Sequence, residues 1–373
     1  MQKIFYFTFI ALLFSCSTNK GEGVIDVKAS FPEVGTNFVS WLDIFPDIEM
    51  IPLTGEQAPM LSPQACRLSI HNGDYYVADP SHTQKTHRFD QNGKYLNSIG
   101  VQGRGPEEYT SILDFMVDDQ GNVVIHPYGE DVLVIYSQDG TFLERRELPL
   151  EPYTFFSFDG FDYNYVGVVG DGSQLYVTDN SGQVVGEFLP QLTSVPYWFS
   201  NIHMFSAYDN GVNFCPAEDN SVYRLKDGKM EVKYRFDFGD YAITDEYYKK
   251  DMDALSGFLL SNTIAYKGGF LENGHCAVLY VAILGKVNPE PFWPTFVMGV
   301  LDKKKDLWKW FGWDDYNSMQ TPLYFDEEYT YILASAELMR EMPGLTERFP
   351  LLNTVTESND TVILKCKTKS IKL

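Results

Sequence analysis

Residues 66–100 read CRLSIHNGDYYVADPSHTQKTHRFDQNGKYLNSIG, and this stretch decides the fold. It contains four short runs of apolar and alternating residues. Asn72-Gly73 separates the first two runs, and Asn92-Gly93 separates the last two. Each pair predicts a hairpin, because glycine reaches the positive φ that a two-residue turn requires. The stretch therefore predicts a four-stranded antiparallel sheet.

The same arrangement of strands and turns recurs along the chain. Residues 114–148 supply the next unit, with the runs DFMVDDQ, NVVIHPY, VLVIYSQ and TFLERREL. Third and fourth units follow, and the hairpin glycines of the four units are separated by 47, 42 and 46 residues. A four-stranded unit repeated at this period is typical of a β-propeller blade. These glycines are Gly93, Gly140, Gly182 and Gly228.

The remaining sequence favours six blades over seven. A fifth and a sixth unit can be assembled from looser runs between residues 270 and 368. The stretch DIEMIPL, residues 47–53, precedes the first unit, and we expect it to pair with TVILKCK, residues 361–367, because propellers close by joining the two ends of the chain. We therefore predict an all-β, six-bladed β-propeller of four-stranded antiparallel blades, closed by its N- and C-terminal strands, with a short helical insertion near residues 244–260.

The N-terminus predicts export and a lipid anchor. Lys3 precedes an apolar run of about 11 residues, which is too short to span a bilayer, and Leu13-Phe14-Ser15-Cys16 resembles a lipobox. We expect residues 1–15 to be a signal peptide, residues 16–35 to be the lipidated Cys16 with a flexible tether, and residues 36–373 to be a single propeller domain.

Charge and cysteine content narrow the classes of partner. The formal net charge is −22, from 51 acidic and 29 basic residues, and such a field repels nucleic acid and anionic lipid headgroups. We expect no nucleic-acid partner, attachment to the membrane through lipid, and a monomer. The cysteines after Cys16 stand apart and mostly within apolar runs, so we interpret them as small buried hydrophobic residues and leave their pairing open. They are Cys66, Cys215, Cys276 and Cys366.

One segment carries a resemblance to a known family. The segment GVQGRGPEEY, residues 100–109, together with DYYVADP before it and ESNDTVILKCK near the end, resembles the six-bladed β-propeller lipoproteins of Bacteroidetes, which are similar to NHL-repeat proteins. The resemblance implies a propeller in the cell envelope, at the outer membrane, with its periplasmic or surface-facing side left open. It implies little chemistry, because that family is largely without assigned function.

The sequence offers no catalytic constellation, and its candidate metal ligands are scattered. Some propellers, such as lactone hydrolases and peptidylglycine lyases, hold a metal in the central channel. Four residues end or follow the proposed second strands of the first four units, where such ligands would sit, although acidic residues there are also ordinary turn formers. No cofactor is otherwise indicated, and calcium is the metal to consider. The four residues are Asp79, His126, Asp179 and Glu218.

Aromatic residues form 15% of the chain and several clusters lie near predicted loops. Most should pack between blades, but exposed rings on a rim could bind a sugar or a protein. Arg104 and Glu107 either belong to a connector between blades or face the channel. We expect a tethered propeller that binds a glycan or an envelope protein without evident catalysis; the alternative is a metal-dependent, lactonase-like hydrolase or lyase. The candidate binding residues are Arg104, Glu107, Tyr109, Trp198, Trp293 and Trp313.

Overall fold

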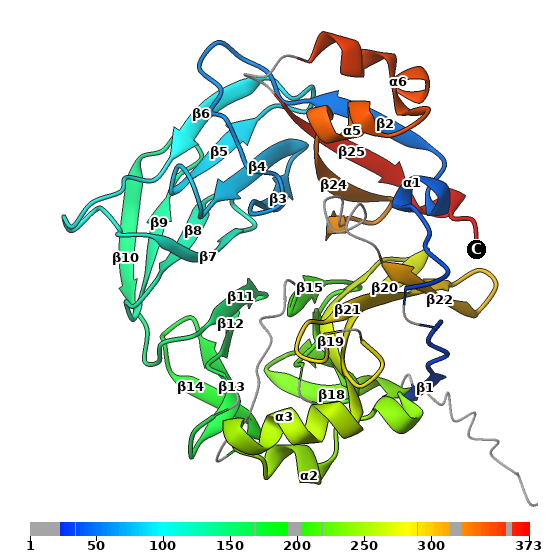
Figure 1. The fold of residues 1–373 in the computed structure, drawn as a ribbon. Helices are drawn as coiled ribbons and strands as arrows, with labels where there is room; N and C mark the ends of the chain where they lie inside the picture. The colour runs from blue at the N-terminus through cyan, green and yellow to red at the C-terminus, as the bar shows by residue number, and fades with distance from the viewer. Residues whose placement is uncertain are drawn as a thin grey trace, which may run out of the picture.

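The computed structural model describes residues 23–33, 35–167, 169–192, 203–217, 219–288, 290–313, 322–355 and 360–373. The described residues form six β-sheets, arranged in a ring around a common centre (Figure 1). This architecture confirms the predicted six-bladed propeller.

Blades 1 and 2 follow the repeats predicted from the sequence, and blade 3 has in addition an innermost strand over residues 154–158, in an aromatic run that the sequence places near a loop. In each one, four strands pair antiparallel in chain order, and the first strand faces the centre of the ring. Blade 1 contains β3 (Arg67–His71), β4 (Asp74–Asp79), β5 (Lys85–Phe89) and β6 (Tyr95–Ile99); blade 2 contains β7 (Ile112–Val117), β8 (Val123–Pro127), β9 (Val132–Tyr136) and β10 (Phe142–Glu147); blade 3 contains β11 (Thr154–Phe158), β12 (Phe161–Tyr165), β13 (Ser173–Asp179) and β14 (Val184–Pro190).

The last three blades vary the same plan. Blade 4 carries an additional strand at its outer edge, and blade 6 takes its outermost strand from the N-terminal part of the chain. Blade 4 contains β15 (Phe205–Ala207), β16 (Val212–Phe214), β17 (Ser221–Lys226) and β18 (Lys229–Asp237); blade 5 contains β19 (Thr263–Glu272), β20 (Cys276–Gly285), β21 (Thr295–Asp302) and β22 (Leu307–Trp313); blade 6 contains β23 (Pro322–Phe325), β24 (Tyr329–Ser335), β25 (Thr361–Lys367) and β2 (Ile48–Pro52).

The ring closes as predicted. Strand β2 pairs antiparallel with β25, and Ile48 lies opposite Cys366. Met50 packs into the apolar cluster between blades 5 and 6, whereas Ile51 packs into the cluster between blades 6 and 1. Successive side chains of a strand point to opposite faces of the sheet, so this one strand contributes to both neighbouring interfaces.

The segment before β2 differs from the predicted tether. Residues Ile25–Lys28 form strand β1, which pairs parallel with β18 at the outer edge of blade 4. Val27 is buried between blades 4 and 5, and Phe38 forms a bridge to Gly312 of β22. A strand of four residues gives almost no periodic signal, which explains why the sequence did not reveal it. Residues 1–22, which include the predicted signal peptide and Cys16, lie outside the described residues.

Helices occupy the connections and the outer surface. The predicted helical insertion corresponds to two helices beside blade 5, which pack there through Tyr247, Leu255 and Leu259. None of the helices in the described part of the chain is long and apolar enough to cross a bilayer. The helices are α1 (Trp41–Ile44), η1 (Gly239–Tyr241), α2 (Asp245–Tyr248), α3 (Met252–Ser261), α5 (Ala336–Glu341), α6 (Leu345–Arg348), η2 (Pro350–Thr354) and η4 (Thr368–Ser370).

Apolar side chains fill the interfaces between neighbouring blades. The cluster between blades 5 and 6 is large because Trp41 and Phe45 of the α1 region, together with the helices after β24, add to it. The cluster between blades 2 and 3 contains only five buried residues of the described chain: Met116, Val124, Leu133, Ile135 and Phe155. The four described cysteines are buried and unbridged, in agreement with their interpretation as small hydrophobic residues.

Candidate functional site

A cavity of about 700 Å³ lies at the centre of the propeller. Residues from the innermost strands of all six blades line it, and in blades 1 to 3 the lining runs from the amino end of the strand to its carboxyl end. Its walls are mainly apolar and aromatic, with a small number of polar groups. Ligand sites of proteins commonly have this size and this composition.

Hydrogen bonds between neighbouring blades hold the cavity walls in place. The Phe270 amide donates to the His203 carbonyl (3.1 Å), and the Ser206 hydroxyl donates to the Phe270 carbonyl (2.9 Å). The Ser157 amide donates to the sulfur of Met116 (3.2 Å), which joins blades 2 and 3. These contacts join the innermost strands of blade 4 to blade 5 and of blade 2 to blade 3.

Arg67 and Asp114 form the main charged pair of the cavity. The Arg67 guanidinium donates to Oδ1 of Asp114, which also accepts from the Phe115 amide (2.9 Å). Oδ2 of Asp114 accepts from the Thr154 hydroxyl (2.5 Å) and the Phe155 amide (3.1 Å). Asp114 is thus satisfied by four donors from three blades, and its side chain is only 9% exposed, whereas that of Arg67 is 42% exposed.

His203 contributes a second polar group to the cavity wall. The residue is partly exposed, but its Nε2 atom is buried and has no hydrogen-bond partner among the described residues. The pKa of His203 is lowered to about 4. Burial is the main cause and the charge of Arg67 adds to it, whereas the Pro322 carbonyl has the opposite effect. The imidazole is therefore neutral at pH 7.

Aromatic rings surround these polar groups. Tyr128 and Tyr153 line the cavity near the amino ends of β7 and β11, with exposed fractions of 68% and 49%. Deeper in the wall, the rings of Phe156 and Phe205 lie 6.2 Å apart, between blades 3 and 4. At the opposite end, the lining includes His71 and the acidic pair Asp118-Asp119, so the two ends of the cavity differ in charge.

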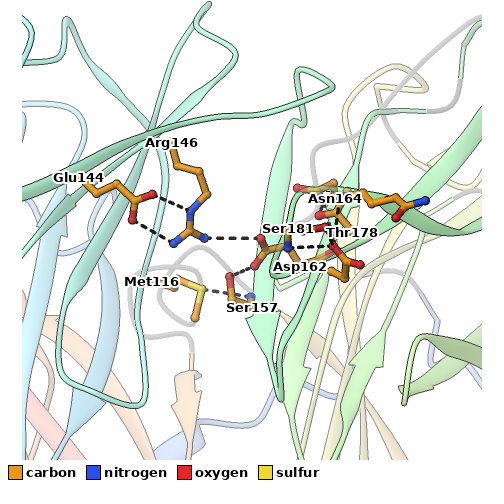
Figure 2. Close-up of polar contacts among 10 residues, drawn as sticks. Met116, Glu144, Arg146, Ser157, Asp162, Asn164, Thr178 and Ser181 are labelled. Atoms are coloured by element: carbon orange, nitrogen blue, oxygen red, sulfur yellow. Dashed lines mark hydrogen bonds and ion pairs between the residues drawn. The ribbon is translucent and has the colours of Figure 1, made fainter.

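Polar contacts cross the junction of blades 2 and 3 near the cavity (Figure 2). Arg146 of β10 lies between Glu144 of its own strand (3.3 Å) and Asp162 of β12 (3.8 Å), and Ser157 donates to Asp162. Burial raises the pKa of Asp162, and the Ser157 hydrogen bond and the charge of Arg146 oppose this shift. This junction therefore combines a small apolar cluster with a partly buried ionic contact.

The structure separates the candidate residues of the glycine-rich segment from the cavity. Arg104 and Glu107 are exposed and do not line the cavity. Tyr109 is only 1% exposed, and its hydroxyl donates to the Gln84 carbonyl (2.7 Å). A Cβ atom at Gly100 would lie 2.3 Å from that hydroxyl oxygen, which explains a glycine there. The segment packs one blade against the next.

The three candidate tryptophans are not brought together by the described residues. Trp293 is 73% exposed in the turn before β21. Trp313 ends β22, but its side chain lies outside the described part of the structure, as does all of Trp198. The aromatic run of residues 153–165, which the sequence places near a loop, instead forms β11 and β12, and several of its rings line the cavity.

The candidate metal residues have local hydrogen-bond partners. Asp79 accepts from the amides of His82 (2.9 Å) and Thr83 (3.0 Å), and Asp179 accepts from the Ser181 amide (2.8 Å). The His126 ring contacts the Val132 and Pro152 carbonyls, at 3.0 and 2.7 Å. Among the described residues, no three His, Cys, Asp or Glu side chains are grouped to hold a metal. Glu218 lies outside these residues.

The sequence analysis did not predict the polar groups of the cavity, although the spacing of the repeat could have indicated two of them. Arg67 and Asp114 are 47 residues apart, which is also the separation of hairpin glycines Gly93 and Gly140. They therefore occupy equivalent positions near the start of the first, innermost strand of successive units. His203 had no comparable signal, because the first strand of blade 4 is short and was not predicted.

These features define a six-bladed β-propeller with an aromatic central cavity. The chain belongs to the family described as "Domain of unknown function (DUF4934)", whose sequence model matches residues 24–367. None of the curated proteins matches it.

Two of the solved structures that are similar to this chain illustrate the shared fold. A Bacteroides fragilis protein named as an exported protein has a TM-score of 0.71 and 17% sequence identity, over 94% of this chain and 100% of that chain. A member of the DUF4221 family from Bacteroides vulgatus has a TM-score of 0.55 and 14% identity, over 87% of this chain and 97% of that chain. At these identities the likeness establishes the fold alone.

Proposed function

We propose that this protein is a lipid-anchored propeller of the bacterial cell envelope that binds a glycan in its central cavity, without catalysis. The single observation that carries the proposal is the cavity of about 700 Å³, which all six innermost strands line. Enclosed sites of this size hold compact organic ligands, whereas a protein partner would need a broad outer surface.

The composition of the lining favours a sugar ligand. Sugar rings have apolar faces and polar edges, and the cavity combines aromatic faces with isolated polar groups. Tyr128 and Tyr153 offer accessible rings in the cavity that Arg67 and His203 also line. A ring that stacks on either tyrosine could direct its hydroxyl groups toward these polar side chains.

The proposed location rests on the N-terminal sequence. The lipobox-like residues 13–16 follow an apolar run of signal-peptide length. The name of the similar Bacteroides fragilis protein supports export. As part of the same hypothesis, we propose that the protein is attached to the outer membrane and is a propeller lipoprotein like those of Bacteroidetes.

Glycan binding is tested by thermal shift and calorimetry on the purified protein with a panel of oligosaccharides. We expect a saturable rise in Tm with at least one of them, because a ligand that binds only the folded state stabilises it. Phe156→Ala, in the cavity wall, should weaken that binding, and Trp293→Ala, at an exposed turn, should not.

Two other results would contradict the proposal. Loss of binding in Trp293→Ala with full binding in Phe156→Ala would place the site on the rim. A bound stoichiometric calcium ion, with a Tm that drops on chelation, would favour the metal-dependent hydrolase or lyase instead.

Lipidation has its own test. Cells that express the protein are labelled with a palmitate analogue, and we expect label and membrane association in the wild type but neither in Cys16→Ala. A membrane-bound, unlabelled wild-type protein would overturn the anchor.

A further inference from the structure

The guanidinium of Arg67 lines the cavity, and its contact with Asp114 occupies only part of its hydrogen-bonding capacity. Arginine has five N–H donors, and one contact from Nη1 joins it to Asp114. Its side chain remains 42% exposed and lines the cavity. The Asp114 carboxylate, in contrast, is 9% exposed and already accepts from three other donors. The positive member of the pair therefore faces the cavity.

The two ends of the cavity differ in charge, and Arg67 lies at the end away from the acidic residues. Asp118 and Asp119 line the cavity at the carboxyl ends of the innermost strands, opposite to Arg67. An anionic group would be repelled from the acidic end and attracted to the guanidinium. Carboxylate and phosphate groups both match the planar fork of arginine donors, and a carboxylate, with one negative charge, suits a single guanidinium.

His203 adds a requirement for a hydroxyl group. Its buried Nε2 has no partner among the described residues, and leaving a buried polar atom unpaired is costly. The neutral ring carries one donor and one acceptor nitrogen, and a hydroxyl can serve either, because it both donates and accepts. A rotation of the His203 ring would turn this nitrogen into the cavity that the residue lines, where a hydroxyl group of a ligand would pair with it in either tautomer.

We infer that the cavity recognises an acidic sugar, a hexuronic acid within a glycan, whose carboxylate binds Arg67 and whose hydroxyl groups reach His203. Tyr128 and Tyr153, which line the same end, provide faces for the sugar ring. This inference rests on the proposed glycan-binding function and narrows it to one chemical class.

The test uses calorimetry with a panel of oligosaccharides that contain hexuronic acids and the carboxyl-reduced form of each. The two forms differ only at the carboxyl group. We expect an acidic oligosaccharide to bind at least about tenfold more tightly than its reduced form, because a charge-assisted hydrogen bond is worth this much. Arg67→Gln should remove that difference, and His203→Phe should weaken both forms.

Arg88→Gln is the matched control. Arg88 also lies in blade 1 and pairs with Asp74, but it does not line the cavity, so this variant should bind as the wild type does. Arg67→Gln leaves Asp114 without its cation, so Arg67→Gln/Asp114→Asn, which removes both charges, serves as the second variant. Circular dichroism and Tm show whether each variant is folded.

Three results would overturn the inference, and they can be told apart. Equal binding of the acidic and reduced forms would reject carboxylate recognition and leave the glycan-binding function standing. Failure of every oligosaccharide to bind the folded protein would reject both. Retained preference for the acidic form in folded Arg67→Gln/Asp114→Asn would remove Arg67 from the site.

Discussion

At the scale of single residues, Asp114 joins three blades through one carboxylate. We expect Asp114→Ala to lower the free energy of unfolding by about 3 kcal/mol, because it leaves buried donors unpaired. Urea denaturation measures the change. Glu144→Ala is the control, since that carboxylate is 51% exposed and pairs weakly with Arg146. Equal effects of the two substitutions would show that Asp114 does not join the blades.

Glu272 is a second buried junction, between blades 4 and 5. It accepts from Lys233 (2.8 Å), Lys303 (2.7 Å) and the Tyr234 hydroxyl (2.7 Å). Burial by itself would raise the pKa of Glu272, but the two lysines outweigh burial and hold the pKa below its usual value. A carboxyl group with a lowered folded pKa stabilises the protein above its unfolded pKa, and this contribution is lost as pH falls through the folded pKa.

We therefore expect Glu272→Gln to destabilise the protein by about 3 kcal/mol at neutral pH, with a difference that narrows below about pH 4. Urea unfolding from pH 7 to pH 3 follows both proteins. Glu49→Gln, at a 66% exposed carboxylate, should show little difference at any pH. A Glu272→Gln penalty that does not change with pH would reject the ionic explanation.

Two hairpin glycines differ in what surrounds them. Gly93 has a φ of 80° and Gly182 a φ of 77°, so alanine is strained at both. A Cβ at Gly93 would also lie 2.2 Å from the Pro52 carbonyl oxygen, whereas nothing lies within 4 Å at Gly182. We expect Gly182→Ala to cost about 1 kcal/mol and Gly93→Ala clearly more. Thermal denaturation compares them, and equal losses would refute the steric argument.

At the scale of elements, β2 is the strand that closes the ring. We expect Ile51→Ala to lower the free energy of unfolding by about 2–4 kcal/mol, because Ile51 is 6% exposed between blades 6 and 1. Glu49→Ala on the same strand should change it by less than about 0.5 kcal/mol. Similar values for both would mean that β2 is not packed as described.

The strands show what a sequence can and cannot reveal. Asn-Gly and Asp-Gly turns identified the hairpins of blades 1, 2 and 4, because these turns have strict backbone requirements. Strands β1, β11, β15 and β23 escaped prediction. Strands β1, β15 and β23 have only three or four residues, and β1 pairs with a strand that is distant in sequence. Tyr109 illustrates the same limit for the site, because a pattern does not distinguish a packed ring from an exposed one.

At the scale of the molecule, the six interfaces are unequal. The junction of blades 2 and 3 holds the small apolar cluster of five buried residues and the contact of Arg146 with Asp162. Segments with few buried apolar contacts open at lower free energy. We expect amides of β7 and β11 to exchange with deuterium faster than those of β19 and β20, as measured by mass spectrometry. Uniform exchange across the blades would contradict this.

The repeat made the whole architecture predictable, but the cavity was not. A repeated hairpin predicts the kind of blade and the number of blades. The cavity instead depends on side chains that six separate units place around one centre. Arg67 and His203 are 136 positions apart, and only the closed ring brings both to the same cavity.

The pairing of β2 with β25 has a genetic consequence. The ribosome synthesises β2 long before β25, although Ile48 of β2 lies opposite Cys366 of β25. A premature stop codon shortly before residue 361 would remove β25 from blade 6 and leave strand β2 without its partner. A nonsense mutation that removes β25 should therefore be as damaging as one that removes several blades.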